Sequence, residues 1–271
     1  MKKGKMKSYH KILIGLVIAY VLFIGIDTIY EHNSNPEIYA PKSTLTVSVK
    51  DKDKALLEGI KAKDKEDGNL TDEVFIESIS EFNSKHERKV NYIVIDKDNG
   101  IARATRKIKY SDYEEPKFFI KKPLVVDMYT AADKPESYVG AKSVVDGNIS
   151  DKVSLESISE KDSKVIARFY VKDSCGVRKD MKLRFTQLNS IPNIRIKLDE
   201  YMLEVEKGTD INPEKYIEYY EENGIKNYSD FSTIRIRDNY NKEKEGIYEF
   251  IYDIRRSNGD YGLTKLVVVV N

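Results

Sequence analysis

Five side chains that end in oxygen lie within nine residues of the chain and could together bind a metal ion. They are Asp64, Glu66, Asp67, Asn69 and Asp72. Calcium prefers carboxylate and amide oxygens, although this spacing is not that of an EF-hand loop. The Asp-Gly-Asn sequence inside the segment is also a common turn-former. The segment is therefore a candidate calcium site, with a structural turn as the favoured alternative, and the sequence indicates no other cofactor.

Tyrosine is concentrated in the last third of the chain, where it could form a binding surface. Four tyrosines fall within thirteen residues: Tyr216, Tyr219, Tyr220 and Tyr228. Exposed tyrosines can stack on sugars or anchor a partner protein. Three of them also fit one face of a short helix at residues 213–222, where core packing is the alternative explanation. We treat the four as candidate partner-binding residues.

Catalytic chemistry has little support in this sequence. The histidines are His10, His32 and His86, too scattered to build a triad or a metal cluster. The single cysteine, Cys175, aligns with Asn99 of an earlier turn and is interpreted as a turn residue. We therefore predict that the chain is not an enzyme.

An internal repeat sets the organisation of the chain. Residues 67–80 return as residues 146–159, with nine of fourteen positions identical at an offset of 79 residues. That spacing suits a small β-sandwich domain and exceeds the period of helical solenoids or propeller blades. We predict an all-β fold of three tandem immunoglobulin-like sandwiches, at residues 44–112, 113–190 and 191–271.

Alternating apolar residues predict the strands of these domains. Residues 90–95 lead into Asn99-Gly100, which predicts a tight turn with positive φ angles before the returning strand. In the third unit, residues 246–254 and 263–270 form the corresponding hairpin, and the run of four valines predicts a strand that is buried on both faces or caps the domain. Outside the N-terminal segment, short helices are expected only at residues 55–63 and 213–222.

An apolar run near the start of the chain predicts a membrane anchor. Residues 12–26 are uncharged and follow five lysines, Lys2, Lys3, Lys5, Lys7 and Lys11. A bilayer core needs about 20 residues, and lysines before the run place the N-terminus in the cytoplasm. We expect a basic cytoplasmic tail at residues 1–11, a single transmembrane signal anchor at 12–30 and a stalk at 31–43. A cleaved signal peptide and a buried core helix are the alternatives.

The motifs of the chain resemble a family of bacterial immunoglobulin-like domains. Residues 64–71, Asp-Lys-Glu-Asp-Gly-Asn-Leu-Thr, match the acidic loop of this family, and residues 246–254 match its Gly-x-Tyr-x-Val-x-Tyr strand. The family is the type first described in a pesticidal crystal toxin, and it is common in tandem on Gram-positive surface proteins. The first two units lack the glycine before the strand, and the third lacks the acidic loop. The resemblance implies a fold and a cell-surface location, and no catalytic residues.

These features together predict a non-catalytic protein outside the cytoplasmic membrane. Lys plus Arg number 46 and Asp plus Glu number 45, so a formal charge of +1 gives no reason to expect nucleic-acid binding. We expect a structural or binding protein held in the membrane by its N-terminal helix, with cell-wall polymers or membrane proteins as partners. The alternative is a secreted adhesin or carbohydrate-binding protein with a cleaved signal peptide.

Overall fold

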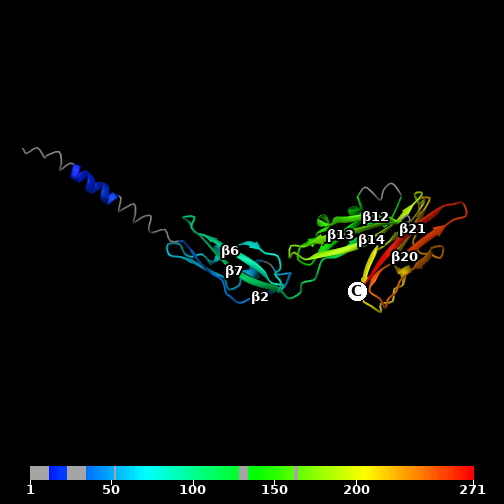
Figure 1. The fold of residues 1–271 in the computed structure, drawn as a ribbon, viewed down its shortest axis with the longest axis horizontal. Coiled ribbons are helices and arrows are strands. Elements are labelled where there is room, and N and C mark those ends of the chain that lie inside the picture. Colours follow the sequence, from blue (N-terminus) through cyan, green and yellow to red (C-terminus); the bar gives the residue numbers. More distant parts are fainter. Residues whose placement is uncertain (1–11, 23–34, 52, 128–133, 162–163) are drawn as a thin grey trace, which may run out of the picture. The chain divides into compact units, whose positions relative to one another are not determined.

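The computed structural model describes residues 12–22, 35–51, 53–127, 134–161 and 164–271 (Figure 1). It shows an all-β chain with six sheets, preceded by a helix at residues 12–22. Within the described ranges, no helix is both long enough and apolar enough to cross a membrane. The rest of the predicted anchor, residues 23–30, lies outside these ranges. The chain divides into two compact units between Asp112 and Tyr113.

Unit 1 contains two sheets. The three-stranded sheet has the order β1 (Glu37–Tyr39), β3 (Lys61–Asp64) and β4 (Gly68–Asn69). The four-stranded sheet has the order β2 (Leu45–Val47), β7 (Ile101–Tyr110), β6 (Arg88–Ile95) and β5 (Phe75–Ile79). A short helix, α2 (Asp53–Leu56), and a 3-10 turn, η1 (Thr71–Glu73), connect the strands.

The core of unit 1 lies between these two sheets. Strand β6 alternates as the sequence predicts, and its Val90, Tyr92 and Val94 are fully buried. They form one cluster with residues of the opposite sheet, including Ala62 of β3. The Tyr92 hydroxyl donates to the carbonyl of Leu56 at 2.7 Å, which gives the one polar atom of this ring a partner in the core. The sheets therefore pack face to face as a β-sandwich.

Unit 2 contains two further pairs of sheets. The first pair comprises β8 (Lys117–Ile120), β10 (Val139–Ser143) and β11 (Gly147–Asn148) in one sheet, and β9 (Val125–Asp127), β14 (Arg178–Leu188), β13 (Lys164–Lys172) and β12 (Ser154–Lys161) in the other. The second pair comprises β15 (Ile194–Leu198), β17 (Ile217–Glu222) and β18 (Ile225–Asn227), facing β16 (Met202–Val205), β21 (Tyr261–Val270), β20 (Gly246–Arg255) and β19 (Arg235–Asp238). Three 3-10 turns, η2 (Pro135–Tyr138), η3 (Ser150–Lys152) and η4 (Pro213–Tyr216), lie between strands.

The three pairs of sheets share one strand order. Each pair consists of a three-stranded sheet and a four-stranded sheet. In each four-stranded sheet, the strand that comes first in the sequence is short and pairs in parallel with the strand that comes last: β2 with β7, β9 with β14 and β16 with β21. The central hairpins are antiparallel, as the alternating sequence predicts. The internal repeat of the sequence therefore corresponds to a repeat of topology that extends to the third pair, where the acidic motif is absent.

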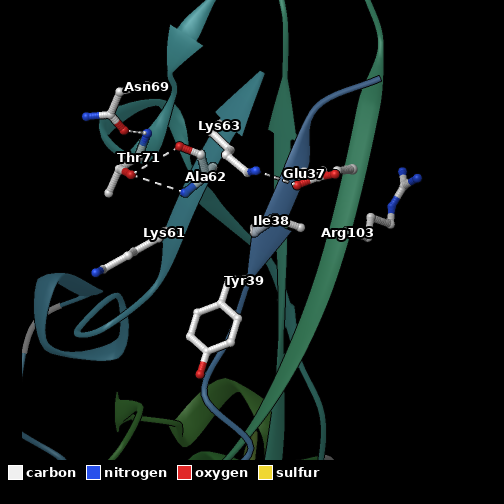
Figure 2. A pocket seen from close by; sticks show the side chains of 10 residues that line it. Glu37, Ile38, Tyr39, Lys61, Ala62, Lys63, Asn69, Thr71 and Arg103 are labelled. Carbon is white, nitrogen blue, oxygen red and sulfur yellow. Dashed lines mark hydrogen bonds and ion pairs between the residues drawn. The ribbon is translucent and has the colours of Figure 1, made fainter. Parts of the chain in front are cut away.

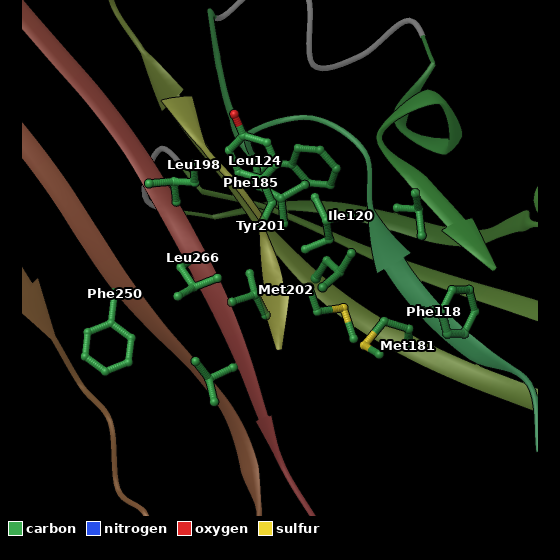
Figure 3. Close-up of a cluster of buried hydrophobic side chains, with 14 of the residues drawn as sticks. Phe118, Ile120, Leu124, Met181, Phe185, Leu198, Tyr201, Met202, Phe250 and Leu266 are labelled. Carbon is green, nitrogen blue, oxygen red and sulfur yellow. The ribbon is translucent and has the colours of Figure 1, made fainter. Parts of the chain in front are cut away.

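The two sandwiches of unit 2 share one continuous hydrophobic cluster. Figure 3 shows Phe118 and Phe185 of the first sandwich in the same cluster as Met202 and Leu266 of the second. The predicted burial of both faces of the last strand is confirmed, because Leu266, Val267 and Val268 are each at most 1% exposed. One face of β21 covers the core of its own sandwich. Its other face borders β13 and β14 of the preceding sandwich across a small groove.

A buried lysine joins these two sandwiches. The Lys265 side chain is 1% exposed, and its Nζ contacts Glu249 Oε1 at 2.9 Å and Thr186 Oγ1 at 3.4 Å, and also the carbonyl of Arg184. Lys265 and Glu249 belong to the last sandwich, whereas Arg184 and Thr186 belong to β14 of the preceding one. A buried ammonium requires such partners because its desolvation is costly. The joint is therefore polar at its centre and apolar around it.

Both predicted helices are wrong in most of their length. At residues 55–63 the helix stops after Leu56, and Gly59, with φ 76°, turns the chain into β3. At residues 213–222 a 3-10 turn of four residues leads directly into strand β17. Pairing with β15 stabilises residues 217–222 as a strand, so tertiary contacts override the helical spacing of the tyrosines.

Removal of the charge that faces Lys265 is expected to destabilise unit 2. In the Glu249→Gln variant the buried ammonium loses its carboxylate, and the loss of one partner of a buried pair costs about 3 kcal/mol or more. Urea denaturation of the purified chain measures this as a lower free energy of unfolding.

The control is Glu245→Gln. Glu245 pairs with Lys207 at 2.6 Å, but both side chains are at least half exposed. Exposed pairs contribute little, so a change below about 1 kcal/mol is expected. Equal effects of the two variants would show that the Lys265 contact does not stabilise the joint.

Candidate functional site

The acidic segment forms the hairpin loop between β3 and β4 of unit 1. Asp64 is 9% exposed, and its Oδ1 accepts the N–H groups of Asp67 at 2.9 Å and Glu66 at 2.7 Å. These bonds, that from Asp67 above all, hold the pKa of Asp64 below its ordinary value. Gly68 adopts φ 78°, which favours glycine at this place in the loop. The Asp64 side chain therefore closes the loop by binding the backbone N–H groups of the loop.

Asp67 points out of this loop to the turn between β6 and β7. Its Oδ2 accepts the N–H of Lys97 at 2.9 Å, and its Oδ1 contacts Lys97 Nζ at 2.7 Å. The hydrogen bond from the Lys97 side chain lowers the pKa of Asp67. The contact joins the three-stranded sheet to the four-stranded sheet at one end of the sandwich. We name such a contact, between the hairpin of the first sheet and the turn of the second, the loop latch.

The other calcium candidates are arranged as in a structural turn. Asn69 Oδ1 accepts the N–H of Thr71 at 3.1 Å, and Glu66 and Asp72 are exposed. Within the ranges that the structure describes, no three Asp, Glu, His or Cys side chains are grouped to hold a metal ion. These hydrogen bonds favour the structural turn, and calcium binding stays a prediction.

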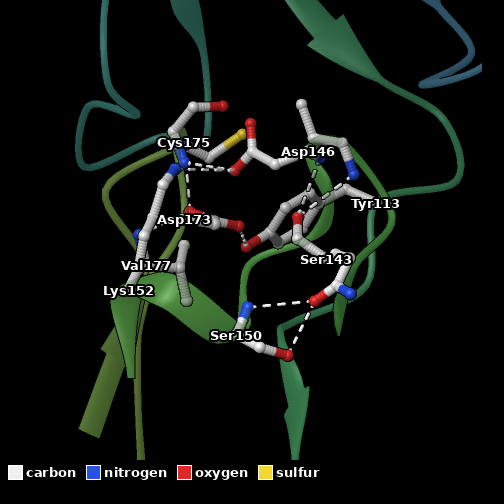
Figure 4. A network of polar contacts seen from close by, with 11 residues as sticks. Tyr113, Ser143, Asp146, Ser150, Lys152, Asp173, Cys175 and Val177 are labelled. Carbon is white, nitrogen blue, oxygen red and sulfur yellow. Dashed lines mark hydrogen bonds and ion pairs between the residues drawn. The ribbon is translucent and has the colours of Figure 1, made fainter. Parts of the chain in front are cut away.

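Unit 2 repeats the loop latch with other residues (Figure 4). Asp146 takes the place of Asp67, and its Oδ2 accepts the N–H of Ser174 at 2.7 Å. Ser143 takes the place of Asp64, and its Oγ accepts the N–H groups of the next loop residues, Val145 and Asp146, at 3.1 and 3.3 Å. A hydroxyl can thus replace the carboxylate that closes the loop, which explains why the second copy functions as a turn with fewer acids.

A buried aspartate organises the turn that each of these latches reaches. In unit 1, Asp96 Oδ1 accepts the N–H groups of Asp98 at 2.9 Å and Gly100 at 2.6 Å. Asp96 Oδ2 is also buried, and among the described residues it has no hydrogen-bond partner. In unit 2 the equivalent residue is Asp173, and there the second oxygen accepts the hydroxyl of Tyr113 at 2.7 Å. Burial, followed by this hydrogen bond, raises the pKa of Tyr113.

The structure aligns the β6–β7 turn with the β13–β14 turn one residue away from the alignment expected from the sequence. Cys175 does not replace Asn99: the left-handed residues are Asn99, with φ 67°, and Gly176, with φ 84°, and Cys175 lies one position earlier. Gly100 does not have a positive φ. A Cβ at Gly100 would lie 2.2 Å from Asp96 Oδ2, so a larger residue there would require the Asp96 side chain to shift, and Val177 occupies the equivalent position in unit 2. The Asn-Gly pair therefore predicts the turn correctly, but only Asn99 has the positive φ angle on which that prediction rests.

The third sandwich has a loop latch of the same polarity, with the carboxylate on the three-stranded sheet and the cation in the turn of the four-stranded sheet. Its β17–β18 hairpin turns through Asn223 and Gly224, both with positive φ, and lacks the acidic loop. The charge instead comes from Glu222 at the end of β17, which contacts Arg256 in the opposite turn at 2.9 and 3.2 Å. The hydrogen bond from Arg256 to Glu222 raises the pKa of the guanidinium. A sequence search for the acidic motif misses this latch because it depends on a pair 34 residues apart.

The four candidate tyrosines do not form one surface. Tyr220 faces the core, where it is 9% exposed, and Tyr216 packs against the edge of that core. Tyr219 lies on the outer face of β17, with its ring centroid 5.5 Å from that of Tyr228 and 4.4 Å from Lys226 Nζ. Tyr228 is 61% exposed. The structure thus brings together Tyr219 and Tyr228, because a strand alternates its side chains where a helix would have gathered them.

Comparisons with known proteins give no family for the chain. No family model matches it, and no curated protein matches its sequence. The predicted membership of the toxin-type immunoglobulin-like family therefore stays a prediction.

Several solved structures are similar at low identity. A structure of CBM51-2 in complex with GlcNAc and INT domains, from Clostridium perfringens ZmpB, has 18% identity over 54% of this chain and 26% of that chain, with a TM-score of 0.23. A ZmpB structure with the M60 catalytic domain has 12% identity over 87% of this chain and 31% of that chain, at 0.24. Human CDH23 EC21-23 has 12% identity over 87% of this chain and all of that chain, at 0.22. The chain spans less than a third of the length of these two ZmpB structures.

The pH dependence of stability tests the role of Asp64. Its pKa is lowered by folding, so its contribution is present above the ordinary carboxyl range near pH 4 and is lost as the pH falls through the folded-state pKa. The Asp64→Asn variant cannot titrate. We expect its stability to fall less steeply than that of the parent chain below about pH 4, measured by urea denaturation across the pH range.

A calcium titration of the same two proteins separates the alternatives. If the loop is a structural turn, millimolar calcium leaves both unfolding midpoints unchanged. A midpoint that rises with calcium in the parent chain and not in Asp64→Asn would establish the calcium site instead.

The hydroxyl of Tyr113 is expected to stabilise unit 2. The Tyr113→Phe variant leaves one oxygen of Asp173, which is 4% exposed, without this donor. An unsatisfied buried acceptor costs about 1–3 kcal/mol, and urea denaturation measures the loss. Tyr228→Phe is the matched control, with an expected change within about 0.5 kcal/mol because its ring is exposed. A Tyr113→Phe variant as stable as this control would contradict the assignment.

Proposed function

We propose that the chain is a non-catalytic protein built of three immunoglobulin-like sandwiches, displayed outside the cytoplasmic membrane, that spaces or binds partners in the cell-wall zone. The main support for this proposal is that one strand order occurs three times, and that in each case a loop latch joins the two sheets. Repeated sandwiches of this kind are scaffolds that present surfaces. The charged side chains of the latches form hydrogen bonds within each sandwich, so they support structure in preference to chemistry.

The anchor in this proposal rests on the N-terminal sequence. Residues 12–26 are uncharged and follow five lysines, and the described part of this run, residues 12–22, is helical. Such a run with lysines before it inserts with its N-terminus in the cytoplasm. The domains at residues 44–112, 113–190 and 191–271 would then lie outside the membrane. Wall polymers and other membrane proteins are the partners that this position brings within reach.

Cell fractionation with an intact-mass measurement tests the proposal. In a Gram-positive host, we expect full-length protein in the membrane fraction, protected from protease in whole cells and digested in protoplasts. The physical reason is that an uncleaved apolar segment stays in the bilayer while the wall shields the domains beyond it. The matched control carries Leu16→Arg and Val17→Arg within the apolar run, which should abolish membrane retention because each arginine costs about 3 kcal/mol at the centre of a span.

Two results would overturn this assignment. Protein truncated near residue 30 and free in the medium would identify a cleaved signal peptide, and the secreted adhesin or carbohydrate-binding protein would replace the anchored one. Full-length protein in the cytosol would exclude export altogether.

A further inference from the structure

The outer face of the three-stranded sheet in unit 1 forms a shallow groove with an exposed aromatic ring. The groove has a volume of about 680 Å³ and runs along β1, β3 and the start of β7 (Figure 2). Ile38 and Ala102, which also line it, pack against the core of unit 1, so the groove reaches the edge of that core. Cross-strand pairing places Tyr39 opposite Lys61, and Glu37 opposite Lys63. These four side chains lie on the outer face, because the residues that alternate with them, Ile38 and Ala62, face the core.

Tyr39 is the feature of this face that folding does not explain. Its side chain is 63% exposed on an edge strand, although a tyrosine ring carries one of the largest apolar surfaces of any residue. Exposed rings of this kind anchor ligands, since a sugar can place the apolar face of its ring on the aromatic face. Asn69 lines the same groove and supplies its side-chain NH2 group for a sugar hydroxyl, whereas the Thr71 hydroxyl is already bonded to the backbone of Ala62.

The charge of this face favours an anionic ligand. Glu37 and Lys63 form a pair at 3.0 Å, but both side chains are about 75% exposed, so the pair is weak. No carboxylate in the described part of the chain forms an ion pair with Lys61. The two lysines and one glutamate leave a net charge of +1 around the tyrosine. Arg103, at the rim, is neutralised by Glu77 at 3.0 Å.

The equivalent faces of unit 2 carry the same combination of an aromatic ring and a lysine. In its first sandwich, Phe119 of β8 lies against Lys142 of β10, whose Nζ is 5.4 Å from the ring centroid. The residue opposite Phe119 is Gly140, where a Cβ would lie 2.3 Å from the ring, so the ring lies flat on the sheet. In the second sandwich, Lys226 Nζ is 4.4 Å from the ring of Tyr219, which is only 6% exposed, and the exposed ring on this face is the neighbouring Tyr228, at 61%. Three outer faces with one composition indicate a shared role.

We propose that these three outer faces bind a polysaccharide that carries carboxylate or phosphate groups, with the groove at Tyr39 as the principal site. The aromatic ring stacks on a sugar ring, and the lysines beside it bind the acidic groups. This deepens the proposed function, on which it rests for the placement of the domains near wall polymers. Three weak sites along one chain bind a polymer more tightly than any one of them alone.

Titration calorimetry of the purified chain tests the proposal with three polymers of similar length. Polygalacturonate has sugar rings and charge, dextran has sugar rings without charge, and poly-L-glutamate has charge without sugar rings. We expect polygalacturonate to bind and the other two to bind at least 10-fold more weakly. Its affinity should fall as salt is raised, because exposed charges contribute.

Variants then locate the site. Tyr39→Ala should weaken binding of polygalacturonate by about 3- to 10-fold, in line with the energy of an aromatic contact. Adding Lys61→Gln to this variant should weaken binding further and make the affinity less dependent on salt. The matched control is Phe75→Ala, because Phe75 is a 50% exposed ring on the other sheet of the same sandwich. It should leave the affinity unchanged. A combined Tyr39→Ala, Lys142→Gln and Tyr228→Ala variant, which alters one exposed residue on each of the three faces, should lose binding.

Each remaining outcome counts against the proposal. Equal binding of poly-L-glutamate would assign the faces to an acidic protein, and equal losses in Tyr39→Ala and Phe75→Ala would exclude the groove. No binding of polygalacturonate at low salt would refute the glycan site itself. These results are independent of cell fractionation, so a failed glycan site leaves the anchored scaffold standing, and a failed anchor leaves the binding data intact.

Discussion

The two sheets of each sandwich share no strand ladder, so what joins them is side-chain packing in the middle and a few polar contacts at the ends. The loop latch is the polar contact at one end. It satisfies a backbone N–H of a turn with a carboxylate from the opposite sheet, as between Lys97 and Asp67. The buried aspartate of the same turn accepts the neighbouring N–H groups and fixes the shape that the latch requires.

The three sandwiches meet this requirement with different chemistry. Unit 1 uses Asp67 and a lysine, the first sandwich of unit 2 uses Asp146 and the backbone N–H of Ser174, and the last sandwich uses Glu222 and Arg256. The carboxylate stays on the three-stranded sheet in all three, while the donor group in the opposite turn changes from a lysine to a backbone N–H to an arginine. This explains how the acidic motif can be absent from the third repeat while its strand order is kept. The acidic motif is one way to join the hairpin of the three-stranded sheet to the turn of the four-stranded sheet, and it is this contact that all three sandwiches share.

Much of the strand structure follows from the sequence, because alternation along residues 90–95 and 246–254 directly reflects which side chains face a core. The valine run at the C-terminal strand also indicates burial on both faces, although not that the second face would lie against the preceding sandwich. Contacts between distant residues could not be predicted in this way. A lysine such as Lys265 is expected at the surface, and its burial depends on partners that lie 16 and about 80 residues away in the sequence. The spacing of Tyr216, Tyr219 and Tyr220 predicts a helix, because spacing alone cannot show that β15 pairs with residues 217–222.

The joint within unit 2 also decides which surfaces remain available. It uses the outer faces of two four-stranded sheets, since Arg184 of β14 contacts Glu249 of β20 and the Lys265 ammonium reaches the backbone of β14. The side chains that alternate with these, such as Phe185 and Phe250, fill the two cores. Both faces of the four-stranded sheets are therefore occupied there, one by the core and one by the neighbouring sandwich. The outer faces of the three-stranded sheets carry Phe119 with Lys142, and the exposed Tyr228 beside Tyr219 and Lys226, and none of these residues takes part in the Lys265 contacts. An aromatic ring that is required neither by a core nor by the joint has its chemistry available for a ligand.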